Sequence, residues 1–186
     1  MVATVQIVRK TGASGAIVST DITSINTRAN AYDTHSTGDI SNGIQIPSVG
    51  TYYSFWVTTR LNCTVTPAGT INNLRWFTDG TGSFGTGVTC KVAKASTGLD
   101  AGYRQATGTV GQTGTQLTQV NHTGLDAAPV DAFTLTAASP LALSGSITNP
   151  STGQFGDHVV YQLEVGTTAA SGATSQETFT FRYDET

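Results

Sequence analysis

Hydrophobic and polar residues alternate along several stretches of this chain, and this alternation predicts β-strands. In residues 53–65, one side of the predicted strand carries Tyr53, Phe55, Val57, Leu61, Cys63 and Val65, and the other carries Trp56, Thr58, Arg60, Asn62 and Thr64. Residues 157–165 likewise place Val159, Tyr161, Leu163 and Val165 on one side, and 178–183 place Phe179, Phe181 and Tyr183 on one side. Each apolar side is expected to face a core.

Such runs recur at short spacing and end at Gly, Pro, Asn or Asp, which are typical turn residues. We expect strands near residues 3–10, 15–25, 43–47, 51–66, 69–78, 86–95, 103–110, 115–121, 131–137, 157–166 and 176–184. No segment has a convincing helical period. The pattern predicts an all-β fold, an antiparallel two-sheet β-sandwich of the jelly-roll or Ig-like kind, with about 9–11 strands and little or no helix.

The chain of 186 residues is long enough for one compact domain, so we predict a single β-sandwich domain over 1–186. Extended terminal strands are possible at 1–10 and 176–186. Such strands could add to the sheet edge of a neighbouring molecule. Deletion of residues 1–10 would then be expected to abolish assembly and leave a folded monomer.

Composition adds that the surface must be solvated mainly by hydroxyl and amide groups. The sequence has 34 threonines and 21 glycines, three glutamates and three lysines, and only 11% charged residues. Threonine is β-branched and suits the half-exposed face of a pleated sheet. Composition therefore agrees with the alternation in predicting sheet.

Charge argues against a nucleic-acid partner, because phosphate binding needs clustered cations and the formal net charge here is -3. The only adjacent basic pair is Arg9-Lys10. No stretch approaches the length of an apolar membrane span, and residues 1–10 alternate like a strand instead of resembling a signal peptide. We therefore expect no membrane partner, no signal peptide and no transmembrane segment.

Two cysteines, Cys63 and Cys90, lie 27 residues apart without the spacing of a zinc or redox motif. Each falls on the apolar side of a predicted strand. They could bridge two sheets, or they could be small apolar core residues. The sequence leaves both alternatives open.

The remaining chemistry-bearing residues are scattered. His35, His122 and His158 have no partner at metal-ligand spacing, and no G-x-S-x-G nucleophile elbow is present. Two of the three glutamates lie in the last ten residues, and aspartates such as Asp79 and Asp100 stand in turn contexts. We predict no catalytic, cofactor-binding or metal-binding residues and no cofactor, and we expect that the protein is not an enzyme.

Trp56 is the residue whose role the pattern leaves most open. If it points outward from its strand, it would form an exposed anchor for a sugar or a protein. If a loop of the same chain covers it, it is an ordinary core residue. Trp76, Tyr52, Phe77 and Phe84 lie in the same part of the sequence.

Three stretches resemble the Thr/Gly-rich β-sandwich proteins of tailed-bacteriophage particles. They are Tyr53-Ser-Phe-Trp-Val-Thr-Thr-Arg-Leu-Asn-Cys63, Ile71-Asn-Asn-Leu-Arg-Trp-Phe-Thr-Asp-Gly80 and Glu177-Thr-Phe-Thr-Phe-Arg-Tyr-Asp-Glu-Thr186. The resemblance is one of texture, without a specific motif. It implies a virion part that decorates or cements a capsid or belongs to the tail.

These observations together lead us to expect a non-catalytic structural subunit of a viral particle or filament-like assembly, located in the virion. Its partners would be copies of itself and other virion or assembly proteins. A carbohydrate-binding or adhesin-like β-sandwich module, with glycans as ligand, is the alternative. A glycan-active enzyme would require two converging carboxylates.

Overall fold

The computed structural model describes residues 2–37, 41–82, 84–96 and 101–186, and these are nearly all strand and loop. One short 3-10 helix, η1, spans Ala132–Thr134. The strands are β1 (Thr4–Thr11), β2 (Val18–Asp21), β3 (Thr51–Tyr53), β4 (Val57–Val65), β5 (Thr70–Phe77), β6 (Val88–Ala95), β7 (Gly108–Thr109), β8 (Thr113–Gly114), β9 (Val130–Asp131), β10 (Leu141–Leu143), β11 (Ile147–Thr148), β12 (Gly153–Gly166) and β13 (Thr180–Glu185). The predicted all-β fold is confirmed.

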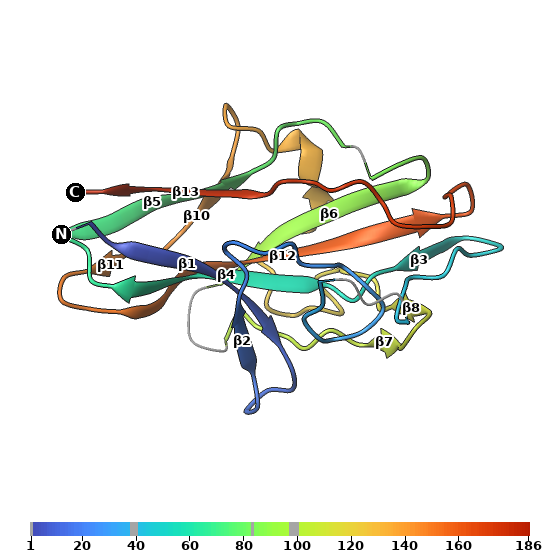
Figure 1. Ribbon diagram of the computed structural model, residues 1–186, viewed down its shortest axis with the longest axis horizontal. Coiled ribbons are helices and arrows are strands. Elements are labelled where there is room, and N and C mark those ends of the chain that lie inside the picture. Colours follow the sequence, from blue (N-terminus) through green and yellow to red (C-terminus); the bar gives the residue numbers. More distant parts are fainter. Residues whose placement is uncertain (1, 38–40, 83, 97–100) are drawn as a thin grey trace.

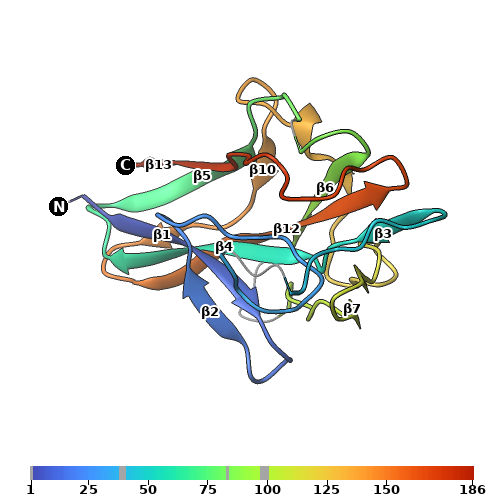
Figure 2. The same cartoon turned by 45° about the vertical axis from the view of Figure 1, so that its right-hand side comes forward.

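Two antiparallel sheets form the body of the molecule (Figure 1). The large sheet has the order β2-β1-β4-β12-β6-β9, with β3 also paired to β12. In the small sheet β5 is central, with β10 and β11 along one side and β13 along the other. β7 and β8 make a separate hairpin. The chain ends lie close together at one end of the sandwich (Figure 2).

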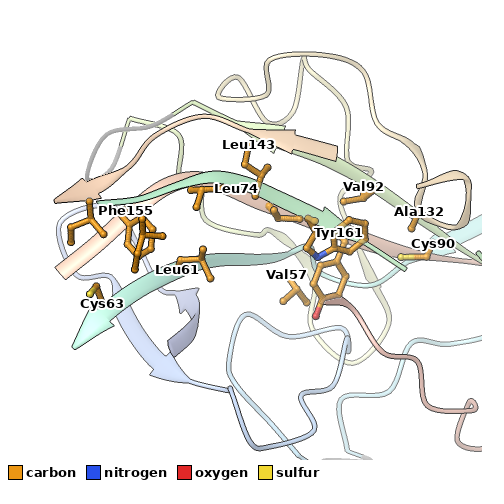
Figure 3. Close-up of a cluster of buried hydrophobic side chains, with 14 of the residues drawn as sticks. Val57, Leu61, Cys63, Leu74, Cys90, Val92, Ala132, Leu143, Phe155 and Tyr161 are labelled. Carbon is orange, nitrogen blue, oxygen red and sulfur yellow. The ribbon is translucent and has the colours of Figure 1, made fainter. Parts of the chain in front are cut away.

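The main core lies between the two sheets, as the alternation predicted (Figure 3). Its buried members come from both sheets and from η1: Val57, Leu61, Cys63, Ile71, Leu74, Trp76, Cys90, Val92, Ala132, Leu143, Ile147, Phe155, Val159, Tyr161 and Leu163. The aromatic residues of the last strand region pack against it, and Phe179 meets Trp76 and Tyr161 edge to face at 5.1 and 4.9 Å. We call this side of the large sheet the sandwich face.

The other side of the large sheet is also buried, which the sequence did not predict. Loops from residues 26–37 and 101–129 cover it, and a second apolar cluster lies beneath them. Its buried members are Ala31, Phe55, Trp56, Ala93, Ala95, Ala106, Leu117, Leu125 and Val160. We call this side the loop-covered face. Because both faces are covered, β12 is almost continuously buried.

The predicted strand over 51–66 is interrupted at residues 54–56. β3 pairs with the last residues of β12, and β4 pairs with its first part, so the chain must shift between them. Phe55 and Trp56 are consecutive and yet both belong to the cluster on the loop-covered face. The placement of Phe55 on the same side as Val57 was therefore wrong.

Other segments follow the prediction unevenly. Strands near 3–10, 69–78, 86–95, 157–166 and 176–184 are present. Only Val18–Asp21 of 15–25 is strand, no strand forms in 43–47 or 115–121, and 103–110 contributes two strand residues. The segment 131–137 gives way to η1, where the Asp131 side chain accepts a hydrogen bond from Phe133 N. Residues 103–110 and 115–121 belong to the loops that cover the large sheet.

Cys63 and Cys90 are both buried and free, so the disulfide alternative is wrong. Figure 3 places them toward opposite ends of the core. Burial raises the pKa of both thiols. They are core residues, the other alternative that the sequence left open.

Candidate functional site

A layer of buried polar side chains lies on the loop-covered face, and it includes two buried histidines and a buried lysine. β1 contributes Lys10 and β12 contributes His158, whose Nε2 lies 3.4 Å from Lys10 Nζ. The covering loops contribute Tyr103, His122 and Arg104. Lys10 Nζ lies 5.6 Å from the centre of the Tyr103 ring, a cation–π contact.

Burial controls the protonation of both histidines. It lowers the pKa of His158 from 6.5 to about 3, with further lowering by the neighbouring charges of Arg60 and Lys10. It lowers the pKa of His122 to about 4, and Arg104 adds to the shift. Both rings are therefore neutral at pH 7. The ammonium of Lys10 must donate to His158, so His158 Nε2 is the acceptor.

His122 and Trp56 show how the layer is packed. Their rings meet edge to face at 5.3 Å, and Trp56 Nε1 donates to the Arg104 carbonyl at 2.9 Å. Trp56 is only 4% exposed. Of the two roles that the sequence left open for Trp56, the structure shows the covered core residue and not an exposed anchor.

Gln162 is the polar tie between the covering loops and the sheet. Its Oε1 accepts a hydrogen bond from Leu117 N at 2.6 Å, and its Nε2 donates to Ser54 O at 2.7 Å and Thr115 O at 2.8 Å. The side chain is 1% exposed. One residue thus satisfies three backbone groups that the loops would otherwise bury without partners.

His122 differs from Gln162, because neither of its ring nitrogens reaches a partner elsewhere in the described part of the chain. It is fully buried. In this closed arrangement the layer holds loops against a sheet and presents neither histidine to solvent. Sequence reasoning missed the layer because its members come from residues 10, 56, 103–104, 122 and 158–162, which share no spacing.

Many of the carboxylates are engaged in local structure. Asp79 Oδ1 accepts a hydrogen bond from Thr81 N at 2.8 Å, which confirms its predicted turn role. Asp157 accepts one from Ser144 N at 2.7 Å and pairs with Lys94 at 3.6 Å. Glu185 binds the amides of Ala3 and Ala68. Asp100 lies outside the described residues.

Two shallow depressions open on the described surface. The first is lined by Lys10, Gly15, Ile17, Ser19, Asn62, Gly153 and Gln154. The second is lined by Phe77, Thr78, Asp79, Thr136, Ala137, Ala138, Thr178 and Thr180. Neither lining brings two carboxylates together, and within the described residues no three His, Cys, Asp or Glu side chains gather as metal ligands would.

The two ends of the chain occupy different positions in the sheets. β1 pairs with β2 on one side and with β4 on the other, and Val8, Arg9 and Lys10 are buried. Deletion of residues 1–10 would remove most of an internal strand, so we now expect it to destabilise the monomer itself. β13, in contrast, pairs only with β5 among the described strands and is an edge strand.

Across the described ranges, no helix has the length and apolar character needed to cross a membrane. No protein-family model, no curated protein and no solved structure matches this chain.

Proposed function

We propose that this protein is a structural subunit of a viral particle or filament-like assembly, of the capsid-decorating, capsid-cementing or tail-associated kind. Its partners are copies of itself and other proteins of the same assembly, and it resides in the virion. The resemblance of its Thr/Gly-rich strands to phage particle proteins gives the proposal its biological setting. The shape and chemistry of the surface give it physical support.

The observation that carries the proposal is a group of exposed apolar side chains on adjoining loops. Tyr32 is 42% exposed, Ile46 39% and Val110 55%. Their segments are joined by hydrogen bonds, from Gly111 N to Ala31 O and from Gln45 N to Gln112 O. Apolar side chains that a monomer leaves in water at neighbouring positions commonly mark a contact surface. We call Tyr32, Ile46 and Val110 the apolar loop group.

The rest of the surface suits a repeated contact. Long, charged side chains lose conformational entropy when an interface orders them, whereas threonine and glycine have little side-chain freedom to lose. With 34 threonines and 11% charged residues, this chain would incur less of that cost than an average domain. A sheet buried on both faces also offers a rigid platform.

Tyr32 favours a second candidate, a carbohydrate-binding or adhesin-like module. It is an exposed aromatic residue, and the carboxylate of Asp33 follows it directly. Sugars stack on such rings and hydrogen-bond to neighbouring carboxylates. Asp33, however, already accepts a hydrogen bond from Gly12 N at 3.0 Å, so part of its capacity serves the fold.

Sedimentation velocity of the purified chain over a rising concentration series tests the proposal. We expect association into defined oligomers, weakened by the double substitution Ile46→Asp and Val110→Asp. Val120→Asp is the matched control, because Val120 is 84% exposed and lies outside the apolar loop group. A chain that stays monomeric at every concentration contradicts the proposal, and selective signal on a glycan array favours the alternative.

A further inference from the structure

β13 leaves one side of its backbone open. It lies along the margin of the small sheet in both views (Figures 1 and 2), and its pairing within the described residues is with β5 alone. An open strand edge presents a row of unpaired N–H and C=O groups to any strand that approaches it. The structure also shows which groups those are.

Hydrogen bonds at the end of the chain fix the alternation of β13. Thr186 N donates to Thr70 O at 3.0 Å, and Thr70 N donates to Thr186 O at 2.8 Å. Backbone groups of alternate residues point to opposite sides of a strand. The register shift opposite β13 lies on β5, where Asn73 has φ 52°, so β13 itself stays regular. Phe181, Tyr183 and Glu185 therefore turn their backbone groups outward.

The charges on β13 are unequally paired inside the molecule. Asp184 lies 3.6 Å from Arg75 and accepts a hydrogen bond from Asn73. Arg182 is exposed, and its cross-strand neighbour on β5 is the like-charged Arg75. No ion pair or hydrogen bond to the Arg182 side chain is present among the described residues. This guanidinium lacks an acid partner there.

We propose that two copies of this chain associate by antiparallel pairing of their β13 strands, with Tyr183 opposite Tyr183 at the twofold axis. This register pairs the outward backbone groups of residues 181, 183 and 185 of both copies. It also places Arg182 of each copy opposite Asp184 of the other, twice. The proposal rests on the proposed function, because it specifies one contact between assembling copies.

Charge excludes the neighbouring registers that also match the backbone. A shift of two residues in one direction sets Arg182 against Arg182, and a shift in the other sets Asp184 against Asp184. Like charges directly opposite each other destabilise a strand pair. The exposed ion pairs therefore select the register, while backbone hydrogen bonds supply most of the association.

Other open edges of the described sheets lack this complementarity. β2 carries Asp21 as its only charge, and β9 carries Asp131 as its only charge. β10 and β11 carry none. Self-pairing of those strands would gain nothing from charge, whereas β13 holds both signs two residues apart. A second copy of β13 is the partner that fits it.

Charge reversal tests the pairing. Arg182→Asp places two acids opposite each other at both symmetric positions, and we expect the dimer dissociation constant to rise about tenfold or more. The new carboxylate faces Arg75 within its own chain, so the fold should hold. Lys91→Asp on β6 is the control, because it changes the net charge equally away from the edge. Equal effects of the two substitutions would overturn the proposal.

Mixing gives the sharper result. Asp184→Arg should also weaken self-association, because Arg182 of each copy then faces a second guanidinium instead of a carboxylate. An equimolar mixture of the Arg182→Asp chain and the Asp184→Arg chain restores both ion pairs, so we expect a one-to-one heterodimer. A mixture that remains as weakly associated as its components overturns the register.

A cross-link keeps the test decisive if Asp184→Arg folds poorly. Residues 182 and 184 of facing copies form a closely spaced pair, within disulfide distance. Chains with Arg182→Cys and Asp184→Cys should form a disulfide-linked dimer when mixed under oxidation, and neither should cross-link alone. Failure of the mixed cross-link contradicts β13 pairing.

Oligomers that persist through all these changes refute this contact and leave the proposed function standing, whereas a monomeric native chain refutes both.

Discussion

The two faces of the large sheet are buried in different ways. The sandwich face packs aliphatic and aromatic side chains against a second sheet. The loop-covered face buries a smaller apolar cluster together with Lys10, His122, His158 and Gln162. The same strands serve both, because alternate residues of β4 and β12 point to opposite sides. Regular apolar packing holds the small sheet on the sandwich face. A few specific polar contacts help to hold the loops on the loop-covered face.

This difference has energetic consequences. Apolar burial on the sandwich face is distributed over many residues and two sheets. On the loop-covered face, a few polar side chains tie the loops to the sheet: Gln162 hydrogen-bonds three backbone groups, and Trp56 Nε1 donates to the Arg104 carbonyl at 2.9 Å. We therefore expect the loops to open locally before the sandwich unfolds.

The two tryptophans allow the largest test of this comparison, because Trp76 of β5 packs in the core on the sandwich face and Trp56 packs in the cluster on the loop-covered face. Trp76→Ala should lower the free energy of unfolding by about 3–5 kcal/mol, since Trp76 is 1% exposed in the sandwich core. Trp56→Ala should lower global stability less, because its main effect is to free the covering loops. Urea denaturation followed by circular dichroism measures this difference in the free energy of unfolding between the two variants.

Hydrogen exchange shows which part of the molecule each tryptophan substitution opens. In Trp56→Ala, amides of residues 101–129 should lose protection while those of β5 and β13 keep theirs. In Trp76→Ala, protection should fall throughout the sandwich. If Trp56→Ala lowers protection equally on both faces, the molecule opens as one cooperative unit and the comparison is wrong.

Substitution of Gln162, which ties the covering loops to the sheet, should have the next largest effect on stability. Gln162→Leu makes the side chain apolar at similar volume but leaves Leu117 N, Ser54 O and Thr115 O without their hydrogen-bond partner. Each such group that water cannot reach should lower the free energy of unfolding by about 1–3 kcal/mol. We expect partial opening of residues 113–117 to relieve part of this cost. Differential scanning fluorimetry and amide exchange follow the change.

Gln154→Leu is the control for that substitution. Gln154 lies on the same strand and makes one exposed hydrogen bond, from its Nε2 to Ser19 Oγ at 3.0 Å. Its loss should cost less than about 1 kcal/mol. Equal midpoints for the two variants would show that Gln162 does not tie the loops.

Alternation predicted the sandwich face well because sheet packing repeats every second residue. Val57, Leu61 and Cys63 on β4, and Val159, Tyr161 and Leu163 on β12, all lie where the pattern placed them. The break at 54–56 escaped it. Phe55 and Trp56 occupy the same cluster because the pairing with β12 changes register between β3 and β4, and such a change depends on tertiary contacts that have no period.

The polar layer and the open edge escaped prediction for a related reason. Nothing in the spacing of Lys10, His122 and His158 shows that a loop folds over a sheet and brings them together. Likewise, both chain ends alternate like strands, but only topology makes β1 internal and β13 an edge. Consecutive apolar residues inside a strand pattern, Phe55-Trp56 and Val159-Val160-Tyr161, are a local signal of a second buried face.

Acid should lower the stability of the molecule, because the loop-covered face buries two neutral histidines. His158 and His122 have folded-state pKa values of about 3 and about 4, below the 6.5 of an exposed imidazole. Between the folded-state pKa of each histidine and 6.5, the unfolded chain binds more protons than the folded chain. The stabilising contribution is therefore fully present above about pH 6.5 and is lost as the pH falls toward the folded-state pKa. The slope approaches about 1.4 kcal/mol per pH unit for each histidine.

His122→Leu isolates one of these two contributions. Both nitrogens of His122 lack a partner elsewhere in the described residues, so an apolar side chain should leave stability at pH 7.5 unchanged or raise it. Between pH 6 and 5 the slope of unfolding free energy should fall by about half, because His158 still titrates. His35→Asn is the control, since the His35 ring is partly exposed to solvent and its removal should change the slope less. An unchanged slope in His122→Leu would mean that His122 takes up its proton in the folded molecule between pH 6 and 5 as it does in the unfolded chain, and hence that water reaches it beneath the covering loops in that range.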